Sequence, residues 1–230
     1  LNFFINIPSH NFDEFEMRGL HLEKNIINFI DVNGVVEVPC RGKIDELVKV
    51  ESLNLSNLNI ENLKFLNCFT HLEWLNLDNN KIVDISPLVS LKNLKTLLLK
   101  NNENINFELL KKIQCLEFLV LGKNNIQNID FLSELINLEY LSLSENNIED
   151  ITPLKKLINL EYLVIDDNKI QDIFILRNLT NLITLQISRN QLKNIDAFSE
   201  LTNLESMSFM DNQVENVMPL ENLKKLESLA

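Results

Sequence analysis

A period of 22 residues runs through the chain from Lys49 to its end. No insertion or deletion interrupts it. Such a fixed period is typical of solenoids, in which each repeat forms one coil and buries its apolar face against neighbouring coils. We number the repeats 1 to 9, the ninth being truncated, and the positions within a repeat place 1 to place 22. The repeats begin at Lys49, His71, Asn93, Cys115, Asn137, Asn159, Asn181, Asn203 and Lys225.

The apolar residues within a repeat follow two spacings. In repeat 5, Leu141 and Leu143 alternate with polar residues, which indicates a short strand with one buried face. Ile148, Ile151 and Leu154 then recur every three residues, a spacing that favours a 3₁₀ helix or tight turns over an α-helix. Each coil is therefore predicted to contain a strand, a turn, a 3₁₀-like segment and a return.

Asparagine occupies place 10 in every complete repeat except the first, which carries Leu58. A buried amide at this place can bond backbone groups of neighbouring coils that have no partner in the sheet. The sequence thus predicts a ladder of buried asparagines along the solenoid. Its members are Asn80, Asn102, Asn124, Asn146, Asn168, Asn190 and Asn212.

These residues resemble the leucine-rich-repeat family, in the 22-residue class shared by bacterial internalins and a eukaryotic phosphatase regulator. The pattern N-L-x-x-L-x-L-x-x-N-x-I-x-D-I-x-P-L-x-x-L matches residues 49–230. The resemblance implies an α/β fold, a right-handed solenoid. A parallel β-sheet is expected on its concave face and short 3₁₀ or turn segments on its convex face. In repeat 3, Asn104 takes an apolar place and Ile105 comes one place late, so we expect a local bulge there.

Residues 1–48 do not fit the repeat. The end of a solenoid exposes an apolar cross-section that another element must cover. Apolar residues from Phe12 to Ile30 recur at roughly helical spacing, and a strand from Val35 to Val38 follows the turn signal Asn33-Gly34. We expect an N-terminal cap made of a helix and a short strand; the alternative is an independent functional domain.

The composition and the absence of catalytic motifs exclude several classes of function. The net charge of −12 repels phosphate backbones, so nucleic acid is not an expected partner. No apolar run reaches the roughly 18 residues needed for membrane insertion. The sequence holds no phosphate-binding glycine loop, no nucleophile elbow and no His or Cys pair at metal-ligand spacing. We therefore expect no enzyme, no cofactor and no metal site.

Places 4, 6 and 8 point outward from the predicted sheet, because places 5 and 7 point inward. Trp and Tyr are favoured in binding hot spots, although aromatic residues also suit strands and pack across them. Ser and Thr replace the aromatic residues on both flanks, so we favour binding. The predicted binding residues are Trp74, Phe118, Tyr140 and Tyr162 at place 4, Leu98, Val120 and Val164 at place 6, and Asp78 and Asp166 at place 8.

Glutamate recurs at place 3, where only Lys95 and Ile183 interrupt it. Like charges stacked along a sheet repel, and a basic partner would relieve the repulsion; the equal alternative is a hydrated face with no partner. We expect a protein partner that is basic or carries an apolar anchor. The stripe comprises Glu51, Glu73, Glu117, Glu139, Glu161, Glu205 and Glu227.

Three functions fit these observations. The first is a non-catalytic protein-interaction module; here the resemblance to internalins implies a bacterial surface or secreted protein that engages a host protein. The second is an intracellular scaffold or phosphatase regulator in the cytoplasm, which the resemblance to the eukaryotic phosphatase regulator implies. Cysteines without a disulfide framework favour this compartment. The third is a structural spacer within a longer chain. The sequence does not fix the oligomeric state.

Overall fold

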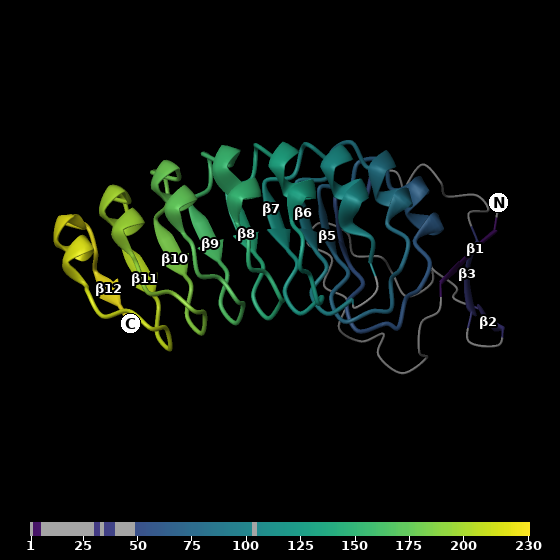
Figure 1. Ribbon diagram of the computed structural model, residues 1–230. Coiled ribbons are helices and arrows are strands. Elements are labelled where there is room, and N and C mark those ends of the chain that lie inside the picture. Colours follow the sequence, from purple (N-terminus) through teal and green to yellow (C-terminus); the bar gives the residue numbers. More distant parts are fainter. Residues whose placement is uncertain (1, 6–29, 33–34, 40–48, 103–104) are drawn as a thin grey trace. The chain divides into compact units, whose positions relative to one another are not determined.

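The computed structural model describes residues 2–5, 30–32, 35–39, 49–102 and 105–230. The chain divides into two compact parts, Leu1–Cys115 and Leu116–Ala230. Figure 1 shows the strands and short helices of both parts. No helix among the described residues is long and apolar enough to cross a membrane.

The first part begins with a small antiparallel sheet in the order β1-β3-β2. Its strands are β1 (Asn2–Ile5), β2 (Ile30–Val32) and β3 (Val35–Pro39). β3 covers the strand expected from Val35 to Val38. Ile30, however, belongs to β2 and not to the expected helix, because its backbone pairs with Glu37 of β3. The rest of that helix and the Asn33-Gly34 turn lie outside the described residues, and capping by residues 1–48 stays a prediction.

Repeats 1 to 3 form three parallel strands in register. Ser52 pairs with Trp74, and Trp74 pairs with Thr96, so partners lie one repeat apart. The strands are β4 (Ser52–Asn54), β5 (Trp74–Asn76) and β6 (Thr96–Leu98), and each is followed by a 3₁₀ helix: η2 (Lys64–Cys68), η3 (Ser86–Ser90) and η4 (Phe107–Lys112).

Repeat 3 departs from its neighbours at η4. This helix has 6 residues where η2 and η3 have 5, and it begins one place earlier in its repeat. Asn106 Oδ1 accepts a hydrogen bond from the Glu108 N–H at 3.1 Å and so caps the first turn. Residues 103–104, where the bulge was expected, lie outside the described residues.

The second part repeats the same coil. Each strand of β7 to β12 pairs in parallel with the next, again one repeat apart, as in Tyr140 with Tyr162 and Tyr162 with Thr184. The strands are β7 (Phe118–Val120), β8 (Tyr140–Ser142), β9 (Tyr162–Val164), β10 (Thr184–Gln186), β11 (Ser206–Ser208) and β12 (Ser228–Leu229). The 3₁₀ helices are η5 (Asp130–Glu134), η6 (Thr152–Lys156), η7 (Phe174–Asn178), η8 (Asp196–Glu200) and η9 (Met218–Asn222).

The apolar places form the core, as their spacing predicts. Leu141, Leu143, Ile148 and Leu154 are all fully buried. Burying one such side chain contributes about 1.5–3 kcal/mol. The every-third spacing gives 3₁₀ turns, in which the Leu154 N–H donates to the Ile151 carbonyl oxygen at 3.0 Å. A leucine-rich-repeat coil therefore follows from the sequence pattern in both parts.

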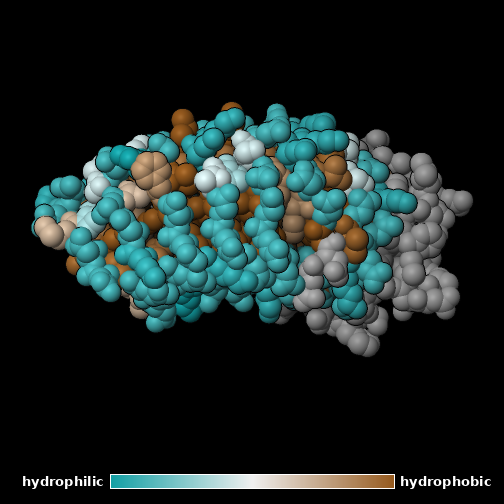
Figure 2. Space-filling view, viewed as in Figure 1, coloured by the Kyte–Doolittle hydropathy of each residue, from teal (hydrophilic) through white to brown (hydrophobic). Residues whose placement is uncertain are grey.

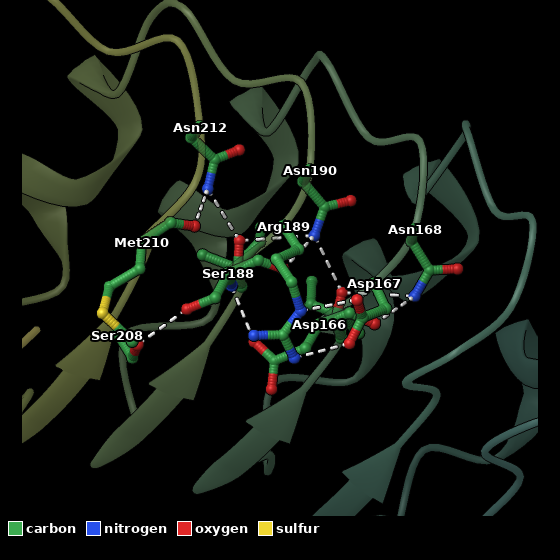
Figure 3. Close-up of polar contacts among 11 residues, drawn as sticks. Asp166, Asp167, Asn168, Ser188, Arg189, Asn190, Ser208, Met210 and Asn212 are labelled. Atoms are coloured by element: carbon green, nitrogen blue, oxygen red, sulfur yellow. Dashed lines mark hydrogen bonds and ion pairs between the residues drawn. The ribbon is translucent and has the colours of Figure 1, made fainter.

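The predicted asparagine ladder is present. Nδ2 of Asn168 donates to the Leu143 carbonyl oxygen of the preceding coil at 3.1 Å and to the Ile165 carbonyl oxygen of its own coil at 3.2 Å. Oδ1 of Asn168 accepts from the Ile148 N–H at 3.0 Å. Figure 3 shows Asn168 with the two ladder residues that follow it, Asn190 and Asn212. Each amide thus joins two successive coils.

Place 1 carries a second row of asparagines that the sequence reasoning missed. Nδ2 of Asn159 donates to the Ile136 carbonyl oxygen at 3.0 Å, and Nδ2 of Asn181 donates to the Ile158 carbonyl oxygen at 2.9 Å. Asn93 and Asn203 make the same bond in their repeats. These exposed amides hold the turn before each strand against the next coil.

Candidate functional site

Three aromatic rings stack on the outward face of the second part's sheet. Phe118, Tyr140 and Tyr162 begin β7, β8 and β9 and pair in register. The Phe118 and Tyr140 ring centroids lie 3.9 Å apart with planes at 7°, and those of Tyr140 and Tyr162 lie 6.1 Å apart at 29°. Each such contact contributes about 0.5–1.5 kcal/mol beyond the area it buries. We call these three residues the aromatic stack.

The stack has a partly buried middle and an open end. Burial raises the pKa of the Tyr140 phenol above its usual range. Tyr162 is 39% exposed, and the next residue in the column is the small Thr184 of β10. One ring of the stack is therefore available to a partner, while its neighbours hold it in place.

Aliphatic and hydroxyl side chains lie next to the stack at place 6. Val120 and Val164 flank Ser142, and all three side chains are half-buried. Figure 2 shows that hydrophobic residues (brown) reach the surface in a band between hydrophilic columns (teal). The sheet face of the second part therefore combines aromatic and aliphatic contact area.

Asp166, a predicted partner contact, is engaged within the fold. Its carboxylate accepts a hydrogen bond from the Ser188 N–H of the next coil at 2.6 Å (Figure 3). Partial burial raises the pKa of Asp166, and this effect exceeds the opposing effect of the Ser188 hydrogen bond. In the first part, Asp78 accepts from the Lys100 N–H at 2.6 Å, and its pKa is raised for the same reason. Both carboxylates hold neighbouring coils together.

Trp74, Leu98 and Asp78 lie on the sheet of the first part. Trp74 and Leu98 are half-buried on β5 and β6. Beside them Lys95 forms an ion pair with Glu73, with Nζ and Oε2 3.2 Å apart. The other predicted binding residues, from Phe118 to Asp166, belong to the second part. The structure brings Phe118, Tyr140 and Tyr162 into direct contact.

The glutamates at place 3 stand directly before the strands and form a row along the N-terminal ends of β7, β8 and β9. The Glu139 N–H donates to the Glu117 carbonyl oxygen at 2.8 Å, and the Glu161 N–H donates to the Glu139 carbonyl oxygen at 2.9 Å. Unlike Glu73, these three carboxylates form no ion pair with any residue that the structure describes. An acidic edge thus borders the aromatic stack.

Two exposed isoleucines near this edge were missed by the sequence reasoning. Ile136 is 51% exposed and Ile158 is 54% exposed. The sequence did hold a signal, because the other complete repeats have polar residues at place 22. Those residues are Thr70, Lys92, Gln114, Thr180, Thr202 and Lys224.

Comparisons with known proteins agree with this architecture. A family model described as leucine-rich repeats in two copies matches residues 116–156 and 158–200. Among solved structures, internalin C2 of Listeria monocytogenes is 30% identical with a TM-score of 0.79, and the match covers 87% of each chain. Another internalin of Listeria monocytogenes is 29% identical with a TM-score of 0.67, over 81% of this chain and 62% of that one.

A leucine-rich-repeat protein of Leptospira interrogans is 26% identical with a TM-score of 0.73, over 80% of this chain and 50% of that one. No curated protein sequence matches the chain. Leucine-rich-repeat proteins are generally protein-interaction modules without catalytic activity, and this chain has the fold of such a module. Its identity to internalin C2 over most of both chains shows that it belongs to the internalin-like leucine-rich-repeat proteins.

Proposed function

We propose that the chain binds a protein partner on the outward sheet face of its second part. The aromatic stack serves as the apolar anchor and the glutamates at place 3 as the acidic rim. One observation carries the proposal: Tyr162 is 39% exposed at the end of a stack that runs through Tyr140 to Phe118. Tyrosine with an apolar body and a free edge is typical of the centre of a protein interface.

Packing between strands does not account for the exposed ring. The sheet pairs in the same register at β6 and β10, where place 4 carries Thr96 and Thr184. Aromatic area left in contact with water has an unfavourable free energy that a partner would remove. Because neighbouring rings already restrict Tyr140, little side-chain entropy would be lost on binding.

The similarity to internalins supports a secreted or surface-exposed bacterial protein that engages a host protein. An intracellular scaffold would use the same face with a different partner, whereas a structural spacer would have no partner on it. Loss of binding on mutation of the stack therefore separates both binding functions from the spacer.

The proposal is tested by replacing the stack with the residue that this fold accepts at the same place. The combined change Phe118→Thr, Tyr140→Thr and Tyr162→Thr copies Thr96 and Thr184. The immobilised wild-type chain should capture specific proteins from a host-cell extract, and the triple variant should not capture them. We expect the affinity of the triple variant for these proteins to be at least about a hundredfold weaker, as is typical when hot-spot residues are removed.

The matched control is Phe174→Asp on η7, away from the strands. Phe174 is 61% exposed, and Asp130 and Asp196 occupy the same place in repeats 4 and 7. This variant should capture the same proteins as the wild-type chain. An unchanged set of captured proteins with the folded triple variant would refute the proposal, and thermal unfolding monitored by circular dichroism checks the fold.

A further inference from the structure

Ile136 and Ile158 are exposed apolar residues that come shortly before two strands of the aromatic stack. They are 51% and 54% exposed and stand in the turns directly before β8 and β9, the strands that begin with Tyr140 and Tyr162. The turns before β10 and β11 have Thr180 and Thr202 instead. The two coils with an exposed isoleucine before the strand are therefore the same two successive coils whose strands begin with tyrosine.

Hydrogen bonds hold the backbone of each isoleucine against the next coil. Asn159 Nδ2 holds the Ile136 carbonyl oxygen at 3.0 Å, and Asn181 Nδ2 holds the Ile158 carbonyl oxygen at 2.9 Å. Neighbouring strands lie about 4.8 Å apart, so residues at one place form a close row. Tyr140 stands four positions after Ile136, so their Cα atoms are at most about 14 Å apart.

Glu139 and Glu161 lie between the isoleucines and the tyrosines in each coil. The Glu161 N–H donates to the Glu139 carbonyl oxygen at 2.9 Å, which aligns the two residues along the edge. Their carboxylates form no ion pair with a described residue, whereas Glu73 pairs with Lys95 in the first part. We call Ile136, Glu139, Ile158 and Glu161 the docking edge.

We propose that the docking edge takes an extended protein segment in which a Lys or Arg side chain lies between two apolar ones. The basic group binds Glu139 and Glu161, one apolar side chain packs on the tyrosines, and the other packs on the isoleucines. The inference rests on the proposed function, because it uses Tyr140 and Tyr162 as one of its two apolar contacts.

Charge complementarity favours a basic partner over a second copy of the chain. The chain has a net charge of −12, so a second copy would bring an acidic surface against the two glutamates. The upper bound of about 14 Å corresponds to roughly four residues of extended chain, so the two apolar side chains of the segment stand at most about four positions apart.

The test selects peptides from a phage-displayed library of random 12-residue sequences on the immobilised chain. Two variants probe the docking edge. The first, Ile136→Thr with Ile158→Thr, introduces the threonine that repeats 6 and 7 carry at the same place. The second, Glu139→Gln with Glu161→Gln, removes two negative charges at nearly constant side-chain shape. The Tyr140→Thr and Tyr162→Thr pair removes the apolar anchor on which both the proposed function and the inference rest.

We expect the wild-type chain to enrich peptides with a basic residue between apolar residues at most about four positions apart. A synthetic peptide of the enriched sequence should bind each docking-edge variant at least about tenfold more weakly, and added salt should weaken its binding to the wild-type chain. Equal binding to the wild-type chain and both docking-edge variants, or enrichment of peptides without basic residues, would overturn the inference. If the tyrosine pair still weakens binding in that case, the aromatic anchor of the proposed function stands. Equal binding to the tyrosine variant would contradict the proposed function.

Dimerisation of the wild-type chain that the isoleucine variant abolishes, measured by analytical ultracentrifugation, would also overturn the inference.

Discussion

The residue at place 9 of every complete repeat has a positive φ, between 53° and 61°. This left-handed conformation costs most residues about 1–2 kcal/mol, and asparagine and aspartate tolerate it best. Most repeats have Asn or Asp at this place, but Lys123, Glu145 and Arg189 do not. Asparagine is thus abundant for two reasons: it forms the buried ladder at place 10, and it tolerates the left-handed conformation at place 9.

Replacing Lys123 with Asn should stabilise the fold. We expect the free energy of unfolding in urea to rise by about 0.5–1 kcal/mol, because Asn adopts the left-handed conformation at lower cost. Lys169→Asn, which removes the same charge at a residue without a positive φ, is the matched control and should not stabilise. A gain equal to that of Lys123→Asn would show that charge and not conformation is responsible.

The carboxylate of Asp166 makes stability depend on pH. Because burial raises its pKa in the folded chain, ionisation is less favourable in the folded state than in the unfolded state. The contribution of Asp166 to the free energy of unfolding is therefore most favourable below the unfolded-state pKa of about 3.9. It is lost as the pH rises through the raised pKa of the folded state. Asp166→Asn keeps an acceptor for the Ser188 N–H and should stabilise the chain at pH 7 by less than about 1 kcal/mol, since the carboxylate is partly exposed.

The comparison of urea unfolding at pH 3 and pH 7 checks this expectation. At pH 3 the Asp166→Asn variant and the wild-type chain should have equal stability. Asp167→Asn should show the opposite pH dependence, because the hydrogen bonds and charge of Arg189 lower the pKa of Asp167, and that stability is lost as the pH falls. The same sign for both variants would contradict the burial argument.

The buried asparagines should contribute more than the exposed ones. In Asn146→Ala the Leu121 and Leu143 carbonyl oxygens lose a donor, and the Asn124 and Ile126 N–H groups lose an acceptor. We expect a loss of about 1–3 kcal/mol in the free energy of unfolding. Asn159→Ala, which removes one exposed hydrogen bond, should cost about 0.5–1 kcal/mol. Equal losses of unfolding free energy in the two variants would show that burial does not increase the contribution of the ladder asparagines to stability.

At the scale of elements, the periods in the sequence predict the strands and 3₁₀ helices well. Every strand from β4 to β12 begins at place 4, and all the described 3₁₀ helices except η4 begin at place 16. η4 begins one place early, where Asn106 caps its first turn. The spacing of Ile30 from earlier apolar residues predicts a helix, and only its pairing with Glu37 reveals a strand.

The 3₁₀ helices are held by their buried leucines more than by their hydrogen bonds. Leu154 of η6 is fully buried, whereas Lys155 beside it is exposed. Leu154→Ala should lower the free energy of unfolding by about 2–5 kcal/mol through lost burial and a cavity, while Lys155→Ala should change it by about 0.5 kcal/mol at most. Urea unfolding followed by circular dichroism measures both, and a small loss for Leu154→Ala would mean that this coil is loosely packed.

At the scale of the whole molecule, the sequence predicts the fold and much of the candidate site. Phe118, Tyr140 and Tyr162 form the expected column, because the repeat fixes which places point outward. The roles of Asp78 and Asp166 were not predictable, since an exposed carboxylate and one that accepts a backbone hydrogen bond occupy the same place in the pattern. Ile136 and Ile158 were missed because an apolar residue in a sequence is first assigned to the core.

The central claim is that Tyr162 lies in the binding surface and Phe174 does not. Incorporating the photoreactive amino acid benzoylphenylalanine at position 162 or position 174, followed by irradiation in a host-cell extract, tests it directly. Both side chains are exposed, at 39% and 61%, so accessibility alone favours position 174. We expect specific cross-linked proteins from position 162 and none from position 174. Cross-links from position 174 with none from position 162 would contradict it.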